Sequence, residues 1–104
     1  MAPEINTYFT PFYYFMKKNG FEMVAADYDK NNEENACVIV FKAGTNFKKL
    51  IDFMRLPKKD VSISTMVSAT DNSYCISLLE NGEVCMTMDK KHHTSIICYI
   101  MANS

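Results

Sequence analysis

The sequence contains little glycine, a single arginine and no tryptophan. Its three glycines are widely separated, whereas loops that cradle phosphate groups need closely spaced ones, so nucleotide hydrolysis is disfavoured. No apolar run approaches the ~20 residues that cross a bilayer, and the N-terminal residues lack the charged and apolar regions of a secretory signal. These absences predict a soluble protein that is not secreted and does not associate with membranes.

Metal-binding and catalytic spacings are also missing. No Cys-x-x-Cys or His-x-x-x-His pair is present, and the adjacent His92 and His93 would point to opposite sides of an extended chain. Glu80 and Glu83 flank a turn, where carboxylates are normally solvated. We therefore predict no metal and no cofactor, and we favour a protein that is not an enzyme.

The four cysteines, Cys37, Cys75, Cys85 and Cys98, lie inside apolar segments. A reduced cysteine behaves as a small buried hydrophobic residue, which indicates a reducing compartment: the cytoplasm, or the host cytoplasm or nucleus for a viral protein. Catalytic cysteines instead lie in exposed, electropositive surroundings. A small cysteine-dependent enzyme, with Cys85 or Cys98 paired to a histidine, is the second alternative function.

A chain of 104 residues, 48% apolar and 22% charged, predicts one folded domain covering 1–104. Two helices are indicated. A Thr-Pro pair caps a helix expected over 11–19, and the second helix begins after Thr45 or Asn46 and ends at Pro57. The predicted buried stripe of the second helix is Phe47, Leu50, Ile51 and Met54.

Six segments have the pattern of strands, either as apolar runs or as alternation with a period of two residues. They span 21–28, 36–41, 61–68, 74–80, 83–89 and 94–101. The order α-β-β-α-β-β-β-β predicts an α+β fold in which two helices pack on one face of a mainly antiparallel sheet of five to six strands.

Asn81 and Gly82 join two of these strands and are typical of a two-residue type I′ hairpin turn. Such a turn would place Leu79 opposite Val84, and both faces of the hairpin would then be largely apolar. Two short helices can cover only one side of the sheet, so we expect one uncovered apolar face, a usual mark of an interaction surface. The alternative is a sheet that curls into a half-barrel or sandwich and buries both faces.

Charged and aromatic residues indicate where a partner would bind. Residues 1–35 carry three lysines against six acidic residues, whereas residues 42–59 carry six basic residues against one aspartate. Methionine and tyrosine are common at protein interfaces. We expect methionines on the uncovered face, and tyrosines on the first helix and the last strand. The predicted partner-binding residues are Lys48, Lys49, Arg55, Lys58, Lys59, Met86, Met88, Tyr99 and Tyr13.

The sequence therefore predicts a non-enzymatic binding protein, homodimeric, that engages a protein partner. Ten lysines, nine asparagines and one arginine are typical of an AT-rich genome, so a viral or phage factor that acts on a host component is the version to test first. The first alternative is a nucleic-acid-associated protein that uses the basic 42–59 segment.

Overall fold

A computed structural model describes residues 4–28, 37–54, 66–68, 74–89 and 93–102. Its helices are the 3-10 helix η1 (Thr7–Phe9) and the α-helices α1 (Thr10–Lys18), α2 (Phe47–Phe53) and α3 (His93–Ala102). Its strands are β1 (Met23–Tyr28), β2 (Cys37–Phe41), β3 (Met66–Ser68), β4 (Tyr74–Leu78) and β5 (Val84–Met88). The chain therefore has an α+β fold, as the sequence predicts. Of the strand predicted over 61–68, residues 61–65 lie outside the described residues.

The named strands pair with their neighbours in antiparallel fashion. Four of them, in the order β1-β2-β5-β4, form the body of the sheet, and the three-residue β3 extends it beside β4. Outside β1, Ile5 forms a parallel bridge with Ala26. The N-terminal segment therefore occupies part of the β1 edge, whose backbone groups would otherwise be open to another chain.

Local signals in the sequence explain where α1 and α2 begin. Pro11 stands in the first turn of α1, where its missing N–H costs nothing. The side-chain oxygen of Asn46 accepts a hydrogen bond from the backbone N–H of Lys49, at 3.0 Å, and caps α2. The predicted stripe of α2 is confirmed, because its four residues are between 0% and 8% exposed.

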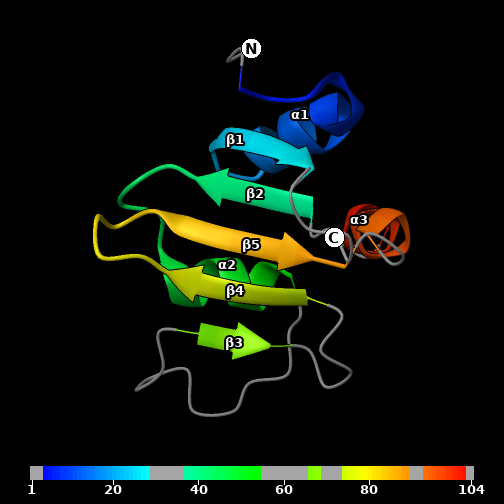
Figure 1. Cartoon of the computed structure of the whole chain (residues 1–104). Helices are drawn as coiled ribbons and strands as arrows, with labels where there is room; N and C mark the ends of the chain where they lie inside the picture. The colour runs from blue at the N-terminus through cyan, green and yellow to red at the C-terminus, as the bar shows by residue number, and fades with distance from the viewer. Residues whose placement is uncertain (1–3, 29–36, 55–65, 69–73, 90–92, 103–104) are drawn as a thin grey trace.

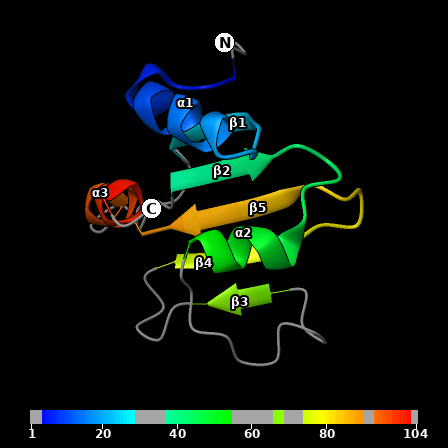
Figure 2. The ribbon, with the colours of Figure 1, turned by 180° about the vertical axis from the view of Figure 1, so that it is seen from behind.

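The helices and the sheet form two layers. Helices α1 and α2 lie on the same side of the sheet, and α3 lies at the end where β5 finishes, in contact with α1 (Figures 1 and 2). Alternate residues of each central strand point into this helix layer. These strand residues are Cys37, Ile39 and Phe41 of β2 and Val84, Met86 and Met88 of β5. They form the core together with buried residues of the helices.

The predicted turn of the β4–β5 hairpin is wrong by one residue. The backbone N–H of Leu79 donates to the carbonyl of Glu83 at 2.8 Å, and that of Gly82 donates to the carbonyl of Leu79 at 3.0 Å. These bonds close a three-residue loop, Glu80 to Gly82, that ends with a glycine of positive φ, as is usual for hairpin loops of this length. Leu78 therefore pairs with Val84, in place of the predicted Leu79.

A shift of one residue moves every side chain of a strand to the opposite face. In the observed register Ile76 lies opposite Met86 in the core, while Cys75 and Ser77 share the other face with Cys85 and Thr87. The prediction that both faces of this hairpin are largely apolar is therefore wrong. Its apolar side chains collect on the covered face, and small side chains remain on the other.

The predicted last strand, 94–101, is also wrong: the segment belongs to α3. His93, Ile97 and Ile100 are buried, and their spacing of four and three residues places them on one face of a helix. Because β-branched residues lower helix propensity only slightly, packing of this stripe into the core outweighs the local preference for a strand.

Candidate functional site

The sheet surface opposite the helices, here called the open face, is the candidate site. Its central rows follow from the register: Ala25, Val40, Cys85 and Ser77 form one row, and Asp27, Val38, Thr87 and Cys75 form the next. Most of these side chains are half-buried, and Asp27 is exposed. In the views of Figures 1 and 2, none of the described helices covers this face. The described helices therefore leave the open face accessible.

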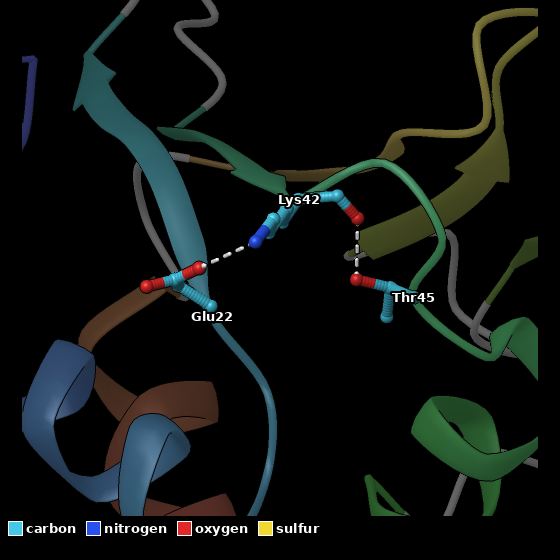
Figure 3. Close-up of polar contacts among 3 residues, drawn as sticks. All are labelled: Glu22, Lys42 and Thr45. Atoms are coloured by element: carbon cyan, nitrogen blue, oxygen red, sulfur yellow. Dashed lines mark hydrogen bonds and ion pairs between the residues drawn. The ribbon is translucent and has the colours of Figure 1, made fainter.

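A charged row closes one end of the open face. Lys42 follows β2, and its Nζ lies 3.6 Å from Oε2 of Glu22 (Figure 3). The carbonyl of Lys42 accepts a hydrogen bond from the hydroxyl of Thr45, which fixes the chain as it leaves β2 (Figure 3). Glu83 stands just before β5, on the opposite side of Lys42 from Glu22. A lysine thus separates two glutamates at this end of the sheet.

A shallow cleft of about 620 Å³ lies at the same end, beside a bulge in β1. The pairing of β1 with β2 skips Val24, between Met23 opposite Phe41 and Ala25 opposite Val40. Bulges of this kind redirect side chains and often accompany functional sites. Apolar and charged residues both line the cleft: Glu4, Tyr13, Glu22, Met23, Val24, Ala25, Val40, Lys42 and Glu83.

The two layers differ in charge. On the open face and its edge, the described acidic residues outnumber the basic ones: Glu4, Glu22, Asp27 and Glu83 stand against Lys42. The exposed side of the helix layer has the reverse balance, with Lys17, Lys18, Lys48, Lys49 and Asp52. A partner with excess positive charge would therefore be attracted to the open face, and an anionic partner to the helices.

The structure separates the residues predicted to bind a partner. Lys48 and Lys49 are exposed on α2, which lies on the far side of the sheet from the open face. Met86 and Met88 are 0% and 1% exposed, so they belong to the core and not to any surface. Arg55, Lys58 and Lys59 lie outside the described residues.

The predicted tyrosines also fall in different places. Tyr99 is 56% exposed on α3. Tyr13 is 7% exposed on α1, while its neighbour Tyr14 is 55% exposed. The sequence indicated that these two neighbours cannot share one buried stripe, but only packing decides which of them turns inward. The Tyr13 side chain still lines the cleft.

A second polar cluster, around His93, was not predicted. Its Nε2 lies 3.2 Å from the hydroxyl of Tyr28 and 3.3 Å from that of Thr94, and the Thr94 hydroxyl shares a 2.6 Å hydrogen bond with Tyr8. The imidazole ring also packs edge-on against both tyrosine rings. The cluster joins η1, β1 and α3, and its histidine was expected in a loop. His92 lies outside the described residues.

Two cysteines have raised thiol pKa values. Burial raises the pKa of Cys37 to about 12, and the charge of Asp27 adds to the rise. Burial also raises the pKa of Cys85, with smaller contributions from Cys75 and Glu83. A cysteine nucleophile needs the opposite shift, toward the thiolate at neutral pH. These two thiols therefore give no support to a cysteine-dependent reaction.

Comparison with known proteins identifies no relative. The chain matches no protein-family model, no curated protein and no solved structure. Within the described residues, no histidine, cysteine, aspartate or glutamate side chains gather in threes as a metal site requires. No helix in the described segments has the length and apolar character of a membrane span.

Proposed function

We propose that the protein is a non-enzymatic binding module that docks a protein partner on the open face. The observation that carries this proposal is the layering: the helices pack on one side, while Val38, Val40 and Thr87 of the central strands stay half-exposed on the other. A half-apolar sheet surface without a covering layer is commonly an interaction site.

Homodimerisation through the open face is the competing version, and charge weighs against it. Two copies packed face to face would bring their excess carboxylates together, and like charges repel. A foreign partner with excess positive charge avoids this repulsion.

The test places a charge on each layer in turn. Val38→Lys inserts a lysine in the middle of the open face, and Tyr14→Lys inserts one at an exposed apolar position of α1. We expect a purified partner, first identified by cross-linking to β2 or β5, to bind Tyr14→Lys as tightly as the wild type. We expect Val38→Lys to weaken binding at least tenfold, measured by calorimetry on variants with native-like spectra.

Two results would redirect the proposal. If Val38→Lys binds the partner normally and Tyr14→Lys does not, the docking surface is the helix layer. If sedimentation equilibrium shows that the wild-type chain alone forms a dimer that Val38→Lys dissociates, the occupant of the open face is a second copy.

Binding of an anionic partner, such as a nucleic acid, is the second candidate function. It is supported by the four lysines of α1 and α2, which are exposed on the helix layer together with the aromatic ring of Tyr14. Clustered lysines neutralise phosphates, and an exposed ring can stack on a base. This surface differs from the predicted 42–59 segment, because Lys42 lies at the open face instead.

A further inference from the structure

We propose that the cleft beside the β1 bulge receives one cationic side chain, an arginine or a lysine, of the protein partner. This inference rests on the proposed function, because the cleft shares Ala25 and Val40 with the open face. It also specifies the kind of side chain that the partner contributes. A basic residue would occupy the cleft, while neighbouring residues of the same segment cross the open face.

The apolar lining of the cleft suits an aliphatic stem. Val24, Ala25 and Val40 contribute methyl groups to this lining, and Val24 is the residue that the bulge leaves out of the β1–β2 pairing. Arginine and lysine carry three or four methylene groups that pack on apolar surface while the charged head stays at the rim. A bare ion or a small polar molecule would leave these apolar side chains without a contact.

The rim suits a positive charge. Glu4, Glu22 and Glu83 contribute three carboxylates, and Lys42 is the single cation among the described lining residues. The Glu22–Lys42 pair spans 3.6 Å with side chains 44% and 67% exposed, so it is a weak pair with which an incoming cation can compete. Hydrogen bonds from an ammonium or guanidinium group to carboxylates are stronger than neutral ones.

Other occupants fit less well. The described lysines of α1 and α2 lie on the helix layer, on the other side of the sheet from the open face. A second copy could place one of these lysines in the cleft only by a head-to-tail contact. Contacts of that kind tend to extend into open chains of molecules. Nucleic acid would be repelled by the carboxylates. A metal ion would need converging ligands, and the described residues form no such group.

The test uses the full chain labelled for NMR and two probe peptides. The first is acetyl-Val-Arg-Val-amide, and the second replaces arginine by citrulline, which has nearly the same shape and no charge. We expect the arginine peptide, at millimolar concentration, to shift the amide signals of Val24, Ala25 and Val40. We expect the citrulline peptide to bind at least fivefold more weakly.

Paired variants assign the effect to the cleft. Glu83→Gln removes a carboxylate from the rim, while Glu80→Gln removes an exposed one from the same turn outside the cleft. We expect Glu83→Gln to weaken binding of the arginine peptide about threefold and Glu80→Gln to leave it unchanged. Because Glu83 accepts a hydrogen bond from Asn81, Glu4→Gln is the second test and should reproduce the loss without touching the turn.

The outcomes separate this inference from the proposed function. Equal binding of the two peptides, or equal effects of Glu83→Gln and Glu80→Gln, would overturn recognition of a cation. Docking on the open face would still stand if Val38→Lys abolished partner binding. If Val38→Lys leaves the partner bound while the arginine peptide still requires Glu83, the cleft is a cation site but the proposed function fails.

Discussion

Gly82 adopts a φ of +87° at the end of the three-residue loop between β4 and β5. A Cβ at this position would meet no atom closer than 3.6 Å, so only the backbone conformation opposes a side chain. We expect Gly82→Ala to lower the free energy of unfolding by about 1 kcal/mol, because residues other than glycine pay that much in the left-handed region. Urea unfolding checks this, with Glu80→Ala in the same turn as the control. Equal stability of the two variants would contradict the observed loop.

Because the thiol of Cys37 is buried, we expect the protein to lose stability in alkaline solution. The pKa of its buried thiol rises to about 12 from the ordinary value of 9.0. A raised pKa in the folded state means that the protonated thiol favours folding fully below pH 9, and that this contribution is lost between pH 9 and about 12. We expect the wild type to lose stability over this range relative to Cys37→Ala. Urea midpoints measured from pH 8 upward give the difference.

The exposed Cys98 provides the matched control for this measurement. Cys98→Ala should follow the wild-type curve, because removing an exposed thiol leaves the buried one in place. Parallel curves for the wild type and Cys37→Ala would show that the buried thiol does not titrate as its surroundings indicate.

At the scale of single elements, the helical conformation of α3 determines which of its apolar side chains are buried. Ile97 is 8% exposed and Tyr99 is 56% exposed, although the two would share one face in the predicted strand. We expect Ile97→Ala to cost about 2–3 kcal/mol and Tyr99→Ala less than about 0.5 kcal/mol. Chemical denaturation of both variants checks the difference. Similar losses at the two positions would favour a strand over the helix.

The β4–β5 hairpin shows why element boundaries were easier to predict than register. The apolar runs located both strands, and the Asn-Gly pair located the turn. Loops of two and three residues both accept this pair, yet they differ in which side chains face the core. The three-residue loop gathers Ile76, Val84 and Met86 on the covered face, so burial of the larger side chains selects it.

For the whole molecule, the opposite charge of the two layers predicts where anions bind. We expect the double variant Lys48→Glu and Lys49→Glu to weaken binding to a single-stranded DNA probe and to reduce its dependence on salt. Lys42→Glu is the matched control on the open face and should leave the affinity for DNA and its salt dependence nearly unchanged. Fluorescence anisotropy of the labelled DNA at several salt concentrations measures both quantities. An equal effect of the control would mean that the separation of charge between the layers does not govern binding.

The candidate site was predictable only in outline. Counting helices against strands predicted a sheet face without a helical cover, and the described elements are arranged in that way. The cleft was not predictable, because its residues come from the N-terminal segment, α1, the paired strands β1 and β2, and the end of the β4–β5 turn. No pattern of residue spacing in the sequence indicates that these segments lie side by side.

The sequence alone located the helices α1 and α2, the strands β1, β2, β4 and β5, and the buried stripe of α2. It could do so because capping residues, a proline in the first helical turn and apolar periodicity act within a few residues of the chain. Tertiary structure alone decided the hairpin register, the helical state of residues 93–102 and the inward turn of Tyr13. In each of these cases two local conformations differ little in free energy, and burial against distant segments selects between them.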